Sequence, residues 1–185
     1  LRTLEYWNAS QDPNPAERTF QITVADNQDE SAAGSLFAQV QPVNDPPELD
    51  LDGVGPDMDY ETTFYINRGP VVVVAESLVV NDIDNTTLKS ATIRIVNLTN
   101  KQAEFLAADL DGDSNIKQTY DPATGVLSLV GADSVSNYQR VLRTITYDNI
   151  LPQPNTETRI IEFTLTDGVT AGAARQTLVS LVVAA

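Results

Sequence analysis

The feature that most constrains this chain is an internal repeat. Residues 1–26 align without a gap to residues 142–167, an offset of 141 positions, and ten of the 26 aligned pairs are identical. After a one-residue shift, the apolar run 36–43 also matches the sequence from Leu178 onward. Self-similarity at a fixed period indicates a tandem array in which each copy is one structural unit.

The repeat divides the chain into three parts. We expect residues 1–43 to be the C-terminal strands of an incomplete repeat, residues 44–52 to be a junction, and residues 53–185 to be one complete repeat. Pro46 and Pro47 in the junction fix φ and remove two backbone donors, so we predict a stiff, extended connector. Residues 1–43 lack an opposing sheet. Either a chain segment upstream or the strands of a neighbouring subunit would have to complete them.

The local pattern is that of an all-β protein. Short segments rich in Val, Ile, Thr and Phe alternate with clusters of Asp, Gly, Asn and Pro, which is typical of strands and turns. One short helix is expected at residues 134–141. The predicted fold is an antiparallel Greek-key β-sandwich, with tandem copies joined end to end. Strands are expected at residues 18–25, 71–75, 91–96, 126–130, 160–166 and 177–183.

Composition excludes several classes of function. The net charge of -15 repels nucleic acid and anionic membranes and favours cations as partners. No run of 18 apolar residues occurs, so no membrane insertion of this segment is expected. The absence of both Cys and His removes disulfides, thiol catalysis and His-dependent triads. No catalytic residue is predicted, and the chain is not expected to be an enzyme.

A set of motif stretches occurs in a specific order and spacing, at residues 43–52, 59–64, 69–71, 82–84, 120–127, 137–143 and 166–168. These stretches resemble the cadherin-like repeats of very large secreted or surface adhesins of bacteria and protists. The resemblance implies a Greek-key sandwich, an extracellular or cell-surface location, and calcium bound where consecutive repeats meet. One position departs from the pattern, because Ile66 stands where such repeats often carry a Glu.

A calcium site needs six to eight oxygen ligands that converge from different loops. Asp82 and Asp84 are two positions apart, so an extended segment would point both carboxylates to the same side. The linker residues Asn44 and Asp45, and Asp26 of the preceding repeat, could join them in one Ca2+ cage. Asp167 occupies the repeat position of Asp26 and would serve the next joint. Alternatively, these residues only form turns, which Asp and Asn favour.

A second acidic run resembles the start of an EF-hand loop. Asp109, Asp111, Asp113 and Asn115 have the right spacing, but Gly112 falls at the fourth position and Tyr120 at the twelfth. An EF-hand needs Gly at the sixth position and Glu at the twelfth. We therefore expect a solvated loop there rather than a second metal site.

Glycan chemistry is a further possibility. Asn8, Asn85 and Asn97 begin N-glycosylation sequons. Trp7, Tyr6 and Tyr147 could form a platform for stacking sugars, yet Tyr6 and Tyr147 are repeat equivalents, which favours a structural role for both.

The favoured function is a structural and adhesive repeat of a long extracellular protein or fibre, stiffened by calcium. Its partners would be neighbouring repeats or subunits of the same protein, with glycans or other surface proteins as further candidates. The alternative is a β-sandwich module that binds a carbohydrate or a protein ligand.

Overall fold

The structure is a computed structural model that describes residues 3–110, 112 and 114–183. The chain divides into two compact units, Leu1–Asn44 and Asp45–Ala185. Each unit is considered by itself.

The strands of the first unit form a hairpin. β1 (Arg18–Ile22) pairs antiparallel with β2 (Gly34–Ala38), and Phe20 lies opposite Leu36. An isolated bridge between Ala25 and Glu30 continues the pairing toward the turn.

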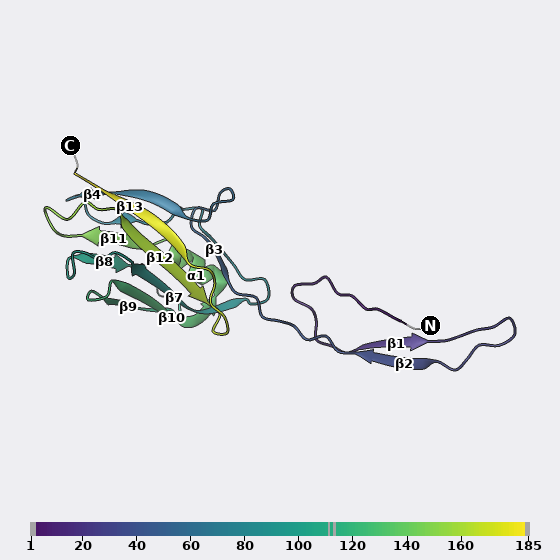
Figure 1. Cartoon of the computed structure of the whole chain (residues 1–185). Helices are drawn as coiled ribbons and strands as arrows, with labels where there is room; N and C mark the ends of the chain where they lie inside the picture. Colours follow the sequence, from purple (N-terminus) through teal and green to yellow (C-terminus); the bar gives the residue numbers. More distant parts are fainter. Residues whose placement is uncertain (1–2, 111, 113, 184–185) are drawn as a thin grey trace. The chain divides into compact units, whose positions relative to one another are not determined.

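The second unit is an all-β sandwich, as predicted (Figure 1). Its larger sheet has six strands in the described residues, in the order β4-β13-β12-β7-β10-β9. All neighbours in this sheet are antiparallel except β4 and β13, which run parallel over seven residue pairs. The strands are β4 (Tyr60–Ile66), β7 (Thr87–Ile95), β9 (Lys117–Asp121), β10 (Val126–Ser134), β12 (Arg159–Thr166) and β13 (Arg175–Val183).

Smaller sheets face the six-stranded one. The three-stranded sheet has the order β5-β11-β8, with β5 (Val71–Val72), β11 (Thr146–Asn149) and β8 (Glu104–Ala107). β3 (Glu48–Asp50) pairs with β6 (Val79–Asn81) and lies inside the segment expected to be a junction. β5 pairs with β11 while β7 pairs with β12, so strands distant in sequence interlock across the two sheets in a Greek-key manner.

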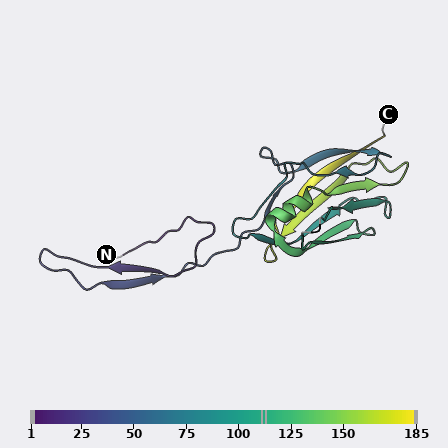
Figure 2. The same cartoon turned by 180° about the vertical axis from the view of Figure 1, so that it is seen from behind.

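Helix α1 (Val135–Leu142) closes one end of the sandwich and contacts β6, β10 and β7 (Figure 2). It begins at Ser134, whose hydroxyl accepts a hydrogen bond from the backbone N–H of Asn137 (3.1 Å). This is an N-cap, which satisfies one of the free N–H groups at the helix start. Tyr138, Val141 and Leu142 form the buried face. The helix predicted at residues 134–141 is confirmed.

The core follows from strand alternation. In β12 every second residue is buried, so Ile161, Phe163 and Leu165 point inward and the residues between them lie toward the surface. The same period in β7 buries Ala91 and Ile93. Together with α1, these strands give one continuous apolar core in the second unit.

The internal repeat is followed in three dimensions without any shift. Thr19 pairs with Phe37 in the first unit, and Ile160, 141 positions later, pairs with Leu178. All five β1–β2 pairs have their equivalents at that offset. The bridge Ala25–Glu30 likewise corresponds to Thr166–Ala171. The one-residue shift inferred from the apolar run 36–43 is therefore wrong, because a slip of one residue would turn every side chain of β2 to the opposite face.

Candidate metal centre and its surroundings

The loop after β6 brings two of the predicted metal ligands together. Asp82 Oδ1 accepts a hydrogen bond from the backbone N–H of Asn85 (2.9 Å). Asp84 Oδ1 accepts one from the side-chain amide of Asn85 (3.0 Å), and Asp84 Oδ2 accepts one from the backbone N–H of Asp45 (3.1 Å). The loop therefore holds Asp82 and Asp84 around Asn85, and the contact of Asp45 with it is made by its backbone N–H.

Asp82 has an incompletely satisfied carboxylate. Its Oδ2 atom is buried and has no hydrogen-bond partner among the described residues. Burial raises the pKa of Asp82 above the usual 3.8, and this outweighs the backbone N–H of Asn85, which acts in the opposite direction. A buried oxygen without a donor is unfavourable, so a cation at Oδ2 would relieve the cost of burying this charge.

The donor chemistry at this loop fits calcium, which prefers carboxylate and carbonyl oxygens. Asp82 and Asp84 are the side chains that would hold the ion. No group of three His, Cys, Asp or Glu side chains suited to a metal occurs among the described residues. Carbonyl oxygens and water would therefore have to supply most of the six to eight ligands that calcium takes.

Asp26 and Asp167 lie elsewhere and share one local structure. Asp26 Oδ1 accepts hydrogen bonds from the backbone N–H groups of Gln28 (2.8 Å) and Asp29 (2.9 Å). Asp167 Oδ1 accepts the equivalent pair, from Val169 (2.6 Å) and Thr170 (2.8 Å). Both carboxylates thus stabilise the turn after β1 or β12, as the turn alternative predicts. Asp26 and Asn44 belong to the first unit, and their part in a calcium cage stays a prediction, as does that of Asp167 at the next joint.

The acidic run that resembles an EF-hand lies partly outside the described residues, because Asp111 and Asp113 are not among them. Asn115 donates its backbone N–H to Asp133 Oδ2 (2.8 Å), and Asp109 donates its own to Thr144 Oγ1 (2.9 Å). These two residues therefore anchor the ends of the run to the sandwich.

The three sequon asparagines have different surroundings. Asn8 is exposed, and its Oδ1 accepts the backbone N–H of Ser10 (3.0 Å). Asn85 is half-buried in the Asp82–Asp84 loop. The Asn97 side chain donates to the Thr158 carbonyl (2.8 Å) and accepts from the Ile160 N–H (2.9 Å), so it ties the turn after β7 to the start of β12 through backbone atoms.

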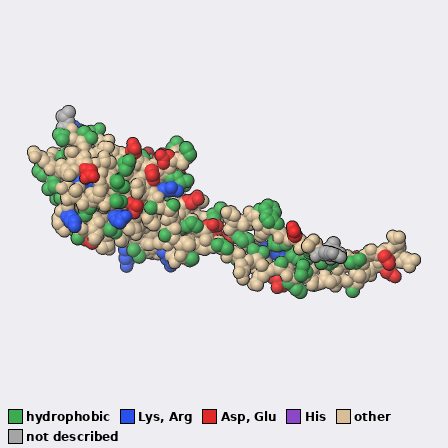
Figure 3. All heavy atoms as spheres, in the orientation of Figure 1, with side chains coloured by type: hydrophobic (Ala, Val, Ile, Leu, Met, Phe, Trp, Pro, Cys, Tyr) green, Lys and Arg blue, Asp and Glu red, His purple; other side chains and the backbone are tan. Residues whose placement is uncertain are grey.

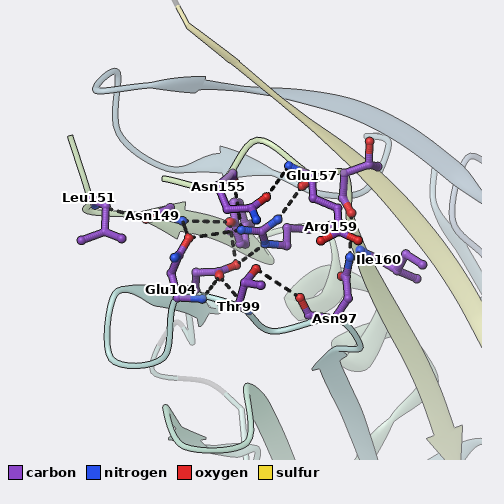
Figure 4. Close-up of polar contacts among 12 residues, drawn as sticks. Asn97, Thr99, Glu104, Asn149, Leu151, Asn155, Glu157, Arg159 and Ile160 are labelled. Carbon is purple, nitrogen blue, oxygen red and sulfur yellow. Dashed lines mark hydrogen bonds and ion pairs between the residues drawn. The ribbon is translucent and has the colours of Figure 1, made fainter. Parts of the chain in front are cut away.

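A buried ion pair is the main polar feature that sequence reasoning missed (Figure 4). Arg159 Nε lies 2.7 Å from Glu104 Oε2, and both side chains are fully buried. Glu104 Oε1 accepts the backbone N–H of Asn100 (2.7 Å), and Tyr147 donates its hydroxyl to Oε2 (2.9 Å). Arg159 also donates to Asn100 Oδ1 (3.2 Å) and to the Asn155 carbonyl (3.1 Å).

This network joins the three-stranded sheet, through β8 and β11, to the six-stranded sheet, through β12. Tyr147 is fully buried and its pKa is raised, first by burial and then by the charge of Glu104. A sugar platform that includes Tyr147 is therefore excluded, and its structural role is confirmed. The one sequence signal for the ion pair was that Arg18 and Arg159 occupy equivalent positions of the repeat.

No protein-family model matches this chain. The chain is similar to halomucin of Haloquadratum walsbyi, with 40% identity over 78 residues that cover 40% of this chain. The matched part is 1% of halomucin, so the chain spans a very small share of a very long relative. The similarity fits a repeat of a large surface protein. Among the described residues, no helix has the length and apolar character needed to cross a membrane.

Proposed function

We propose that this chain is part of a tandem array of structural repeats in a long surface protein, and that calcium bound at the Asp82–Asp84 loop stiffens the array. The observation that carries the proposal is the exact recurrence of strand register and turn hydrogen bonds at 141 residues in two separate units. A chain that repeats the same strand pairing and turn in this way suits a spacer or tether, and its composition predicts no catalytic residues. The similarity to halomucin supports a place at the cell surface.

Calcium binding is supported by the surroundings of Asp82. The loop contacts the start of the second unit, since Asp84 accepts a hydrogen bond from the backbone N–H of Asp45. An ion there would neutralise two carboxylates of a chain with a net charge of -15. It would stabilise the folded state by mass action, because the unfolded chain does not hold these oxygens together.

Thermal unfolding of the full chain in calcium and in excess chelator tests the proposal. Calcium should raise the melting temperature by several degrees, and magnesium should do less because it loses its water reluctantly. Identical melting curves in calcium and chelator would remove the metal from the proposal.

The variant Asp82→Asn locates the site, because its melting temperature relative to the parent should depend on whether calcium is present. Without calcium it should melt above the parent, since it removes a carboxylate whose pKa is raised by burial. With calcium it should lose the rise in melting temperature that the parent shows. Glu76→Gln, at an exposed position, removes the same charge and should keep that rise. If Asp82→Asn responds to calcium as the parent does, the ion binds elsewhere.

The surface of the second unit gives little support to the alternative function of binding a carbohydrate or protein ligand. A hollow of about 440 Å³ on the second unit is lined by Asp52, Asp57, Asp59, Tyr60, Glu61, Gln176 and Leu178. Ligand pockets are mostly apolar with a few convergent polar groups. This hollow is predominantly acidic and does not favour that function.

A further inference from the structure

Apolar side chains are exposed in the first unit at positions whose repeat equivalents are buried in the second. Hydrophobic side chains are visible at the surface of the first unit in Figure 3. Tyr6 is 43% exposed and Val24 is 68% exposed, whereas Tyr147 and Leu165 are 0% and 2% exposed. The first unit therefore presents one face of a sandwich core that nothing in that unit covers. Other exposed apolar residues of this unit with a buried equivalent are Leu4 (Ile145), Ile22 (Phe163) and Leu36 (Thr177).

The polar scaffold of the buried ion pair is already formed on this face. Arg18 donates to the carbonyls of Ala16 and Asn14, as Arg159 donates to those of Glu157 and Asn155. The Asn14 side chain accepts the N–H of Ala16 (2.8 Å), which reproduces the bond between Asn155 and Glu157 (2.7 Å). The guanidinium of Arg18 is thus oriented by the same backbone carbonyls as that of Arg159.

The acidic partner is what distinguishes the two arginines. Arg159 reaches Glu104 on β8 and Asn100 before it, whereas no ion pair of Arg18 with an acid occurs within the described residues. Residues 1–44 correspond to residues 142–185, so the first unit contains no equivalent of residues 45–141, where Glu104 lies.

We infer that the exposed face of the first unit is a docking site for the N-terminal part of a repeat of this kind, a segment equivalent to residues 45–141 that brings a buried Glu against Arg18. The inference rests on the proposed tandem-repeat function and names the partner that completes an incomplete repeat. The recognition is dual: an apolar face requires an apolar cover, and a preformed arginine site requires one carboxylate at the position of Glu104.

The core volumes agree with this occupant. Ile161 and Phe163 of β12 are replaced by Phe20 and Ile22 in β1, which exchanges a large and a smaller side chain within one face. Volume-conserving changes of this kind are tolerated in cores. A segment shaped to cover β12 therefore has about the right volume to cover β1.

The test places a copy of residues 45–141 directly before Leu1 of the full chain, because Val141 precedes Leu142, the equivalent of Leu1. Amide hydrogen exchange at residues 18–24 is then compared with that of the unextended chain. We expect the added segment to slow exchange there by at least ~100-fold, as burial of a strand in a cooperative unit does.

Variants in the added segment test the carboxylate. Glu104→Gln in that copy should remove most of the protection, since it leaves Arg18 buried without a counter-charge. Glu76→Gln in the same copy, at an exposed position, should preserve it. Equal protection with Glu104→Gln would overturn the role of the ion pair, and absence of protection with the parent segment would overturn the docking site.

Two outcomes for the unextended chain would also overturn the inference. Protection of residues 18–24 in a monomer would mean that the face needs no partner. Protection that rises with protein concentration would identify a second copy of this chain as the occupant. Because melting of the second unit in calcium and chelator is recorded on the same samples, failure of the proposed calcium function remains distinguishable from failure of docking.

Discussion

Replacement of Arg159 by Met should destabilise the second unit strongly. Arg159 and Glu104 are both fully buried and 2.7 Å apart, so the variant leaves a carboxylate inside the core without its counter-charge. Removing one partner of a buried pair typically costs about 3–5 kcal/mol. Glu104 would keep its hydrogen bonds from Asn100 and Tyr147, which favours the lower end of that range.

The expected change is large enough to measure by two methods. For a folded unit of this size, a loss of about 3 kcal/mol corresponds to a decrease in melting temperature of roughly 10 °C. Urea unfolding followed by circular dichroism should show a lower midpoint with an unchanged slope, because the surface exposed on unfolding stays the same.

The surface pair Arg94–Glu162 provides the matched control. Its atoms are also close, at 2.8 Å, but the side chains are 48% and 25% exposed. Exposed pairs contribute about 1 kcal/mol or less, so Arg94→Met should have a small effect. The double variant Arg159→Met with Glu104→Gln should lose less stability than the sum of the two single variants. If Arg159→Met costs no more than Arg94→Met, the reasoning about burial is refuted.

Three further predictions concern the second unit or the whole chain. Burial raises the pKa of Asp133, but its four hydrogen bonds outweigh this and lower the pKa below the usual 3.8. The stability that Asp133 contributes is therefore present above its unfolded-state pKa of 3.8 and is lost as pH falls through its lower folded-state pKa. Urea midpoints between pH 6 and 3 should show a steeper acid loss in the parent than in Asp133→Asn. Gly53→Ala should cost at least about 2 kcal/mol, because its Cβ would meet the Ser77 carbonyl, whereas Gly55→Ala, also at positive φ but in open space, should cost only about 1. Added NaCl should raise the melting temperature in chelator, since it screens the net charge of -15, and an unchanged value would contradict that repulsion.

The sequence predicted the elements whose pattern is local. Period-two alternation located β7, β10, β12 and β13, although β7 and β10 extend beyond the predicted limits. The strand expected at residues 71–75 has only two residues in β5; Val73 still donates its backbone N–H to Ile145 (3.0 Å), but no further strand pairs follow, and Val73 and Val74 are buried in the core. Backbone pairing, which a single strand's composition does not report, sets that limit.

The sequence analysis did not predict β3, β4, β6, β8, β9 or β11 as strands, and β8 and β11 show how a mixed pattern conceals a strand. β8 begins with Glu104, a charged residue that becomes fully buried only because Arg159 lies opposite it in the fold. β11 contains Asp and Asn, and its buried Asn149 is satisfied by contacts with distant residues. Hydrophobicity alone assigns such residues to the surface. Their burial depends on partners about 50 positions away, which no local pattern indicates.

The candidate site was predicted only in part. The spacing of Asp82 and Asp84 located the acidic loop, and the structure adds the N–H of Asp45 to it. For Asp167, the turn interpretation describes the hydrogen bonds that the structure has. Both interpretations predict the same residue types, and only the direction of the backbone N–H groups separates them.

The parallel pairing of β4 with β13 has a mechanical consequence. The chain enters β4 at Tyr60 and leaves β13 at Val183, and the seven pairs between these strands lie side by side in register. Opposite pulls on the two ends of the second unit would slide one strand along the other and strain all the pairs at once. A pull across the hairpin β9–β10 would instead open its pairs one after another. In single-molecule pulling, the unit should therefore resist an end-to-end force better than a force applied across that hairpin, as a link that carries tension requires.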